Sequence, residues 1–483
     1  MTHPINRLLR PYFWFFVFCY IFLSCTKEDK NEPKEAVSGF ETEVFDRRFQ
    51  KNSLSLVCQV DSAFYFRNLS SGGKGVVYHW DFGDGSESSL FSPKHIFATS
   101  GNYRVRLTVT LPSGAYAISE KELSVIAGQK RIELNGNYDT GTYDIVEGEG
   151  GSLALFCWSR RAGDFSGPKN AGMVTLDRDL RQVRRVDFPA GFRISAALAA
   201  DAGNFIVLGS SVGKTINNEL IKIGPAGAVI WTREISSGIN FEAVLSTADG
   251  YLINGTSKGG NGENLTILVK TDLSGAVIWS KEYEGMEACG NVTADGDTFL
   301  AAGVKKSANL NCNSCDSLSI MRIDRSGAVI RRTNTLLNAT TVPISRAYLS
   351  FVEGKAIAVA ISATRSLLTY SSSLAPQLQT NVIYEIAHMG MSAGGDILLL
   401  QREYTNGFRA TYTGLDLNGA RKWGYTVDGS EFFTGGYRCC NNSQGIKTRP
   451  LQKGGSVFIA DETASSGRNV AMVTKIAENG RLM

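Results

Sequence analysis

The sequence predicts an all-β protein made of two β domains, a sandwich followed by a seven-bladed propeller. Two observations lead to this prediction. Residues 40 to 127 form short runs in which apolar and polar residues alternate, the period of half-buried strands. After them, a glycine followed by an apolar strand recurs seven times at spacings of 41 to 60 residues, which fits four-stranded propeller blades better than helical repeats.

The composition suits such a fold and excludes several classes of protein. The 483 residues include 51 Gly and 11 Pro, which favours tight turns over proline-rich linkers. Hydrophobic residues make up 43% and charged residues 20%, so the chain can bury a large core and is not disordered. The net charge is only +4 and no basic cluster occurs, so nucleic acid is not an expected partner. Four His leave little material for a histidine metal site or relay, and no metal is expected.

The amino terminus predicts a signal peptide over residues 1–24. Arg7 and Arg10 precede an apolar run over 12–23, which is shorter than the ~20 residues that span a bilayer. The run ends at Phe22-Leu23-Ser24-Cys25, which resembles a bacterial lipobox, although Phe22 stands where Leu is usual. The resemblance implies that Cys25 is acylated and binds membrane lipid. An ordinary secretory signal and a single-pass anchor are the alternatives.

Residues 25–38 are predicted to be a polar tether. The stretch after Cys25 is rich in Lys, Glu and Asp and has nothing to bury. Such a charged stretch resembles the signal by which some diderm bacteria export lipoproteins to the cell surface. The expected location is therefore the outer membrane, with the protein lipid-anchored and exposed at the surface.

The first domain is predicted over residues 39–127. Its core signal is Trp80-Asp81-Phe82-Gly83-Asp84-Gly85, followed by a P-x-H-x-F element at 93–97 and a G-x-Y-x-V-x-L-x-V strand at 101–109. In this order the motifs resemble the PKD domain, an Ig-like β-sandwich that serves as a spacer or as a protein or glycan contact module. Trp80 and Phe82 should fill the core between the sheets, and Asp84-Gly85 should close a turn with positive φ.

Three polar residues of this domain have both a structural and a functional interpretation. His95 is expected to be a packed core side chain rather than a catalytic one. Asp81 and Asp84 are expected to cap a turn, with binding of Ca²⁺ left open.

The second domain, residues 128–483, is predicted to be the propeller. Each unit is expected to contain an inner strand, a second and a third strand, a D-x-x-G turn and an outer strand. The recurring glycines are Gly151, Gly203, Gly250, Gly296, Gly354, Gly395 and Gly455. Trp231, Trp279 and Trp423 recur at one repeat position, which favours packing between blades over sugar stacking. Lys222, Lys270, Arg322 and Lys475 also recur, and solvated or blade-bridging charges are expected there.

The last unit has only Arg481-Leu482-Met483 after its turn glycine, too few residues for an outer strand. Residues 131–135, which precede the first blade, are therefore predicted to complete the last blade, the one that contains Val457 and Val473. This pairing would remove two open sheet edges.

The G-x-x-x-W spacing resembles the docking motif of quinoprotein-type propellers, and the L-V-K-x-D-x-x-G-x-x-x-W pattern resembles repeats of secreted bacterial propellers. The seven copies and the shorter turn depart from quinoproteins. No quinone or other cofactor is therefore expected.

The cysteines favour an oxidising compartment. Cys58 and Cys157 lie in apolar strand contexts and are expected to be buried thiols. Cysteines in long polar loops are the candidates for disulfides, with a Cys₄ zinc site as the alternative. These are Cys312, Cys315, Cys439 and Cys440.

The predicted function is binding or scaffolding at the cell envelope, with a glycan or an envelope protein as the unknown partner. Loops that join strands two and three share a face with loops that join blades, and both kinds are long here. The predicted contact residues on this face are Arg160, Phe165, Lys305, Tyr404, Phe408, Phe432 and Tyr437. Nucleophile motifs, paired acids and metal-spaced histidines are missing from the sequence, so no enzyme is expected. A propeller-type glycan hydrolase or lyase and a subunit of an envelope secretion or motility assembly are the alternatives.

Overall fold

The structure is a computed structural model that describes most of residues 36–482. The residues outside the description are 1–35, 47–50, 72–73, 133–137, 163, 165–168, 213–215, 261–263, 287–288, 290–291, 306–316, 337–346, 353–355, 362–365, 382–384, 393–394, 404–408, 428–446, 464–468, 478–481 and 483. The described part confirms the predicted fold class, an Ig-like sandwich followed by a seven-bladed propeller.

The sandwich consists of a four-stranded sheet with the order β2-β1-β4-β7 and a five-stranded sheet with the order β3-β9-β8-β5-β6. Its strands are β1 (Phe40–Asp46), β2 (Lys51–Leu54), β3 (Val57–Gln59), β4 (Ala63–Asn68), β5 (Val77–Asp81), β6 (Glu87–Ser88), β7 (Lys94–Ile96), β8 (Gly101–Thr110) and β9 (Tyr116–Ile126). Val37 already pairs with Ser71, so the ordered domain begins slightly before residue 39, where the sequence placed its start.

The core of the sandwich is aromatic. Trp80 and Phe82 are both buried, as predicted, and Trp80 makes an edge-to-face contact with Phe40 at 5.1 Å between ring centroids. The indole Nε1 of Trp80 donates to the carbonyl of Leu90 at 2.9 Å, which satisfies its polar atom inside the core. Gly85 has a φ of 89°, the left-handed conformation that the predicted turn requires.

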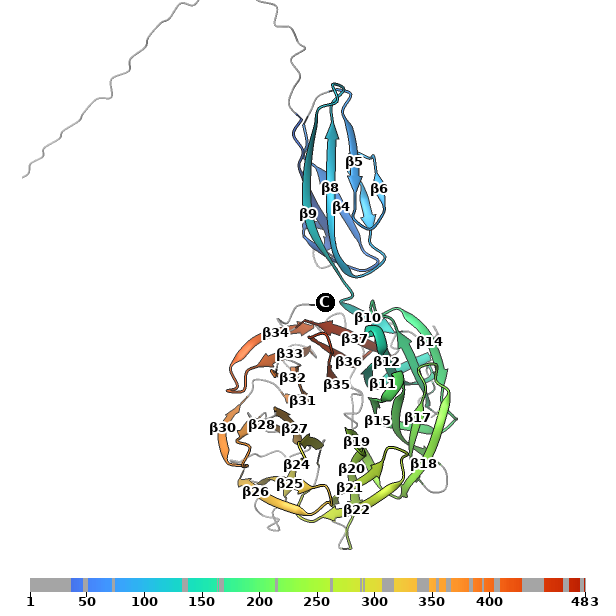
Figure 1. The fold of residues 1–483 in the computed structure, drawn as a ribbon, viewed down its shortest axis with the longest axis vertical. Helices are drawn as coiled ribbons and strands as arrows, with labels where there is room; N and C mark the ends of the chain where they lie inside the picture. The colour runs from blue at the N-terminus through green and yellow to red at the C-terminus, as the bar shows by residue number, and fades with distance from the viewer. Residues whose placement is uncertain are drawn as a thin grey trace, which may run out of the picture. The chain divides into compact units, whose positions relative to one another are not determined.

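The propeller consists of seven four-stranded antiparallel sheets, and each complete blade follows its predecessor in chain order (Figure 1). Blades one to three are β11 (Tyr138–Glu147), β12 (Leu153–Arg161), β13 (Asn170–Leu176), β14 (Gln182–Asp187); β15 (Phe192–Ala199), β16 (Phe205–Val212), β17 (Ile216–Ile223), β18 (Val229–Ser237); β19 (Asn240–Thr247), β20 (Gly250–Lys258), β21 (Asn264–Asp272), β22 (Val277–Tyr283). Short 3₁₀ turns lie at Glu149–Gly151 and Asp201–Gly203.

Blades four to six continue the same pattern. They are β23 (Val292–Asp295), β24 (Thr298–Lys305), β25 (Ser317–Asp324), β26 (Val329–Leu336); β27 (Ala347–Val352), β28 (Ala356–Ile361), β29 (Ser366–Tyr370), β30 (Pro376–Asn381); β31 (Glu385–Met391), β32 (Ile397–Glu403), β33 (Arg409–Leu415), β34 (Arg421–Val427). The first strands of successive blades contact one another and surround the centre of the ring. The strand that follows each recurring glycine is the second strand of its blade.

The seventh blade joins the two ends of the propeller sequence. It contains β35 (Lys447–Pro450), β36 (Ser456–Thr463), β37 (Asn469–Ile476) and, as its outer strand, β10 (Gln129–Ile132). Lys130 pairs with Val473 and Ile132 with Ala471 in an antiparallel register. The closing strand thus begins at Gln129 rather than at residue 131, and residues 133–135 of the predicted strand lie outside the described part.

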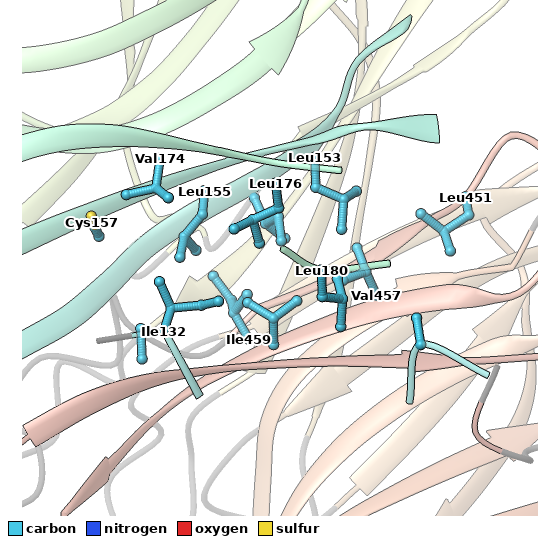
Figure 2. Packing of buried hydrophobic residues seen from close by; sticks show 14 residues of the cluster. Ile132, Leu153, Leu155, Cys157, Val174, Leu176, Leu180, Leu451, Val457 and Ile459 are labelled. Atoms are coloured by element: carbon cyan, nitrogen blue, oxygen red, sulfur yellow. The ribbon is translucent and has the colours of Figure 1, made fainter. Parts of the chain in front are cut away.

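An apolar core fills the seam between the first and seventh blades. Leu153, Leu155 and Val174 from blade one face Val457 and Ile459 from blade seven, and all five are fully buried (Figure 2). Burial of aliphatic surface on both sides of the seam stabilises closure in addition to the hydrogen bonds of β10.

The D-x-x-G turns share one geometry. In blade three, Asp272 Oδ1 accepts hydrogen bonds from the backbone N–H of Ser274 and of Ala276 at 2.8 and 2.9 Å, and Gly275 has a φ of 82°. Asp324 and Asp416 hold their turns in the same way. In blade five Ser371 replaces the aspartate, and Leu374 occupies the glycine position with a φ of 60°. The repeat therefore keeps the turn even where its signature residues are lost.

Candidate binding face

Strand topology places five long connections on one face of the propeller. Antiparallel strands return at alternate ends of a blade, so connections from strand two to three open on the same side as connections from blade to blade. These five follow β12, β20, β24, β32 and β34 and span residues 162–169, 259–263, 306–316, 404–408 and 428–446. The connections after β22 and β26, over 284–291 and 337–346, open on the same side. We call this side the loop face and the opposite side, which carries the D-x-x-G turns, the turn face.

Few of the predicted contact residues lie in the described part of the chain. Arg160 is the penultimate residue of β12 and Lys305 the last residue of β24, both at the ends of their strands toward the loop face. The remaining five lie outside the described residues. They are Phe165, Tyr404, Phe408, Phe432 and Tyr437.

Arg160 makes an ion pair within blade one. Its Nη2 lies 3.4 Å from Oδ2 of Asp139, its cross-strand neighbour in β11, and the two side chains are only 12% and 5% exposed. Mutual proximity and low exposure strengthen this pair relative to a surface ion pair. The guanidinium of Arg160 is thus held by Asp139 inside the blade. It is less accessible to a ligand than the sequence predicted.

Trp158 and Lys169 form a second feature of this edge that sequence reasoning missed. The indole of Trp158 lies over Gly141 of β11, where an added Cβ would be 2.4 Å from the ring. The exposed Lys169 places its Nζ 4.0 Å from the ring centroid, a cation–π contact. A tryptophan at the end of a second strand, outside the repeated turn, is the sequence signal that could have identified it.

The recurring tryptophans mainly pack between blades. A Cβ at Gly275 of blade three would lie 2.8 Å from Trp231 of blade two, so the ring covers that turn. Trp279 of blade three donates from Nε1 to the carbonyl of Arg325 in blade four at 2.8 Å. Trp423 packs over Gly414 of its own blade instead. The interpretation of Trp231 and Trp279 as packing residues is confirmed.

The recurring cations are held at the turn face. Lys270 is buried; its Nζ donates to the carbonyl of Thr271 at 2.8 Å and lies 2.9 Å from Oδ1 of Asp249, whose pKa is lowered chiefly by this hydrogen bond. Arg322 pairs with Asp295 and donates to the carbonyl of Ser372 in the next blade. Lys475 bridges from blade seven to the Arg178 carbonyl of blade one at 2.7 Å. Arg322 and Lys475 therefore bridge blades as predicted, whereas Lys270 is neither solvated nor, in its described contacts, bridging.

In the sandwich, the aspartates of the W-D-F-G-D-G motif cap turns. Asp81 Oδ1 accepts from the N–H of Gly83 at 2.9 Å, and Asp84 Oδ1 from that of Ser86 at 3.0 Å. His95 packs edge-to-face on Phe97 with centroids 4.6 Å apart, but it is half-buried rather than fully in the core. These contacts account for all three residues as structural ones.

Described cysteines are buried thiols. Cys58 and Cys157 are buried as predicted, and Cys289 is buried as well. Burial raises the pKa of Cys58 to about 11, which keeps it protonated and unreactive at neutral pH. The disulfide candidates Cys312, Cys315, Cys439 and Cys440 lie outside the described residues, as does Cys25.

The described residues contain neither a candidate metal site nor a candidate membrane-spanning helix. No group of three or more His, Cys, Asp or Glu in that part of the chain could hold a metal ion. Within the same residues, no helix has the length and apolar character needed to cross a membrane.

Comparison with known proteins identifies the sandwich. The PKD domain family matches residues 59–125, which carry the aromatic core and the capped turn described above. This part of the chain is a PKD domain. It is 41% identical over 56 residues to the collagenase ColQ1 of Bacillus cereus (strain Q1), a match that covers 12% of this chain and 6% of the collagenase. The PKD domain is also similar to the crystal structure of the PKD1 domain of Vibrio anguillarum Epp, at 30% identity, with 20% of this chain and 96% of that chain covered and a TM-score of 0.15.

The propeller has more distant structural neighbours. A quinonprotein alcohol dehydrogenase-like protein from Bacteroides thetaiotaomicron is 10% identical, with 77% of this chain and 93% of that chain covered and a TM-score of 0.42. Streptogramin B lyase is 12% identical, with 72% and 97% covered and a TM-score of 0.40. These likenesses concern the fold alone.

Proposed function

We propose that this protein is a lipid-anchored component of the bacterial cell envelope that binds a glycan or protein partner through the loop face of its propeller, without chemistry. The observation that carries the proposal is that the five long connections described above open on one face of a rigid ring, together with those over 284–291 and 337–346. Loops on a rigid scaffold are the usual carriers of recognition, because their sequence can vary without disturbing the blades.

The chemistry of these connections supports recognition. They contain the aromatic residues Phe165, Tyr404, Phe408, Phe432 and Tyr437 together with several cations. Aromatic side chains supply contact area at low entropic cost, and cations supply hydrogen-bond donors. At the edge of this face, Lys169 stacked on Trp158 adds a described example of the same pairing.

The location follows from the amino-terminal sequence together with the PKD domain. The lipobox-like junction at Cys25 and the charged tether favour an anchor on the outer membrane, with the domains exposed at the cell surface. Mass spectrometry of the membrane-extracted protein should show an acylated amino-terminal Cys25, and Cys25→Ser should release the protein from the membrane. An unchanged membrane fraction would contradict the anchor.

Binding is tested with Phe408→Ala and Tyr437→Ala on a glycan array and in a pull-down from envelope extracts. Both variants should keep the melting temperature of the parent and lose binding. Arg421→Ala, which lies beside the turn of blade six, is the matched control and should bind normally. Normal binding by the two loop variants would reject the loop face, and turnover of a glycan by the purified protein would reject the absence of chemistry.

A further inference from the structure

Three adjacent blades carry exposed aliphatic pairs at the same position. Directly after the turn, the outer strands β18, β22 and β26 begin with Val-Ile. All six side chains are between 44% and 59% exposed. With Leu273, which is 56% exposed in the turn of the middle blade, they form what we call the rim patch. Its members are Val229, Ile230, Leu273, Val277, Ile278, Val329 and Ile330.

The blade itself does not require aliphatic residues at this position. The turn of blade six closes with the same hydrogen bond, Asp416 N–H to the Ala420 carbonyl, yet it is followed by Arg421 and Lys422. Blade five has Pro376 and Gln377 there. Because the same fold accepts polar residues at equivalent exposed sites, the packing of the repeat does not explain the Val-Ile pairs of blades two to four.

The rim patch is continuous from blade to blade. Trp231 and Arg233 of β18 lie over Gly275 in the turn of blade three, where an added Cβ would be 2.8 Å from Trp231 and 2.9 Å from Arg233 Cγ. Trp279 and Lys281 of β22 cover Gly327 of blade four in the same way. The outer strand of one blade therefore covers the turn of the next blade, and the next Val-Ile pair follows directly after that turn. Figure 1 shows β18, β22 and β26 in succession along one arc of the rim.

Two cations separate the aliphatic pairs. The aliphatic stem of Arg233 packs on the Gly275 turn and that of Lys281 on the Gly327 turn, and both side chains are exposed. An apolar stem that lies along apolar surface while its charged end reaches water is the arrangement that suits a membrane interface. Exposed aliphatic patches on a soluble domain mark an interaction site when folding does not account for them.

We propose that the rim patch contacts the surface of a lipid bilayer and holds blades two to four against it. A bilayer is flat and the rim is convex, so the bilayer would contact the middle blade of the three first. Blade three is the middle blade, and it alone of the three has an exposed leucine, Leu273, in its turn. The corresponding turn residues of the flanking blades are Pro225 and Arg325. A second copy that paired through the same patch would present an equally convex rim and would meet it only near the middle.

The nearby bilayer comes from the proposed function, on which this inference rests. Only 10 residues lie between Cys25 and residue 36, the first that the structure describes. Even fully extended, they reach about 35 Å. An anchored chain therefore keeps the start of its folded part close to a membrane and confines the propeller to the neighbourhood of that membrane, so weak contacts become effective at the resulting local concentration. Because the rim patch lies on the outer strands beside the turn face, this contact leaves the loop face uncovered.

The charges of the patch predict how binding responds to salt. Arg233 is followed by Glu234 and Lys281 by Glu282, so charges nearly cancel along β18 and β22, whereas β26 adds the exposed Arg331 and Arg332 directly after Ile330. Apolar insertion should therefore dominate on phosphatidylcholine, where partitioning should change less than about twofold between 0.1 and 0.5 M NaCl, and vesicles that contain phosphatidylglycerol should show a larger loss. A site driven by basic residues would lose most of its binding over that range.

The test uses the chain from residue 26 onward, which keeps every described strand and lacks the acyl anchor, so its outcome is independent of Cys25. It is mixed with phosphatidylcholine vesicles, or with vesicles that also contain phosphatidylglycerol, and separated by flotation. We expect measurable partitioning on both, a loss of more than about tenfold in Ile230→Ser/Ile278→Ser/Ile330→Ser, and no loss in the matched control Arg421→Ala.

Three results would overturn the proposal. One is a parent chain that stays entirely soluble with both vesicles, and another is a triple variant that floats like the parent. The third is a dimer in light scattering that the triple variant abolishes, because the patch would then be covered by a second copy. Equal melting temperatures of parent and variants ensure that the comparison concerns the patch. If Phe408→Ala and Tyr437→Ala still bound their partner, the proposed loop face would be rejected, but the vesicle-binding result would stand.

Discussion

Asp144 and Arg449 form a bidentate ion pair that joins the first strand of blade one to the first strand of blade seven. Arg449 donates from Nε to Oδ1 at 3.1 Å and from Nη2 to Oδ2 at 2.7 Å. The same carboxylate accepts the N–H of Ala197 in blade two at 3.0 Å and that of Ile145 at 2.9 Å. One fully buried aspartate therefore links three successive blades at the seam of the ring.

We expect Asp144→Ala to lower the free energy of unfolding by about 3 kcal/mol, because it leaves a charge and two backbone donors without their acceptor. This is the lower end for a broken buried pair, since the Arg449 side chain is 38% exposed and water can reach it. Urea unfolding measures the change. Asp144→Leu/Arg449→Leu should cost less than Asp144→Ala, and Asp164→Ala, at an exposed position, should change little. A single variant as stable as the parent would show that the pair does not support closure.

Removal of β10 should open the ring. A chain that starts at residue 137 leaves β37 with an unpaired edge and exposes apolar seam residues such as Ile459, so it should melt at a lower temperature or aggregate. The matched control starts at residue 128; it lacks the PKD domain but keeps β10. Equal melting temperatures of the two chains would disprove closure by this strand.

Leu374 sets backbone strain against burial. Its φ of 60° costs a non-glycine residue about 1–2 kcal/mol, whereas its side chain is buried in the core between blades four and five. Loss of a buried leucine costs about 2–5 kcal/mol, so burial outweighs strain and Leu374→Gly should destabilise the propeller. Leu374→Ala loses the same packing and keeps the strain. The free energy of unfolding should be highest with Leu374, lower with Gly and lowest with Ala. A glycine variant more stable than the parent would show that backbone strain at this position outweighs burial.

Acid should weaken the turns only as the pH falls below the ordinary range of aspartate, because the turn carboxylates hold on to their charge longer than unperturbed surface carboxylates. The pKa of Asp272 is lowered by the hydroxyl of Ser274 and the N–H of Ala276, and that of Asp324 by the hydroxyl of Ser326 and the N–H of Ala328. A folded pKa below the unfolded value of about 3.9 gives stability that is present above that pH and lost as pH falls through the folded pKa.

The corresponding variant is Asp272→Asn/Asp324→Asn, whose amide oxygens still accept the turn hydrogen bonds but do not titrate. Melting temperatures at pH 7 and pH 3 should differ less in this variant than in the parent. An equal drop in both proteins would show that these carboxylates do not contribute to acid unfolding.

Local patterns were sufficient to predict the architecture. The aspartate and glycine of the D-x-x-G turns act within five residues, so this signal repeats visibly in the blades that keep them. The glycine-led strands are apolar because neighbouring blades bury them on both faces, and this signal repeats as well. The closing strand was predictable for a similar reason, because one blade lacked a strand and an unassigned strand preceded the first blade.

The interactions that tie the ring together had no such signal. Asp144 and Arg449 are separated by 305 residues, and neither recurs in the other blades. Asp139 and Arg160 meet only through the register of β11 and β12, which residue types do not specify. The rim patch also depends on a comparison of exposure at equivalent positions, and a sequence gives the equivalence of Val277 and Arg421 but not their exposure.

The pairing of β10 with β37 also has a consequence during synthesis. β10 is made before any blade, and its partner emerges only after all the others, so the seam is the contact that must form last. A nascent or interrupted chain keeps both edges unpaired and remains open to proteases. A chain that stops before β37 cannot pair β10 and therefore cannot close the ring, so only the full-length propeller has both edges covered.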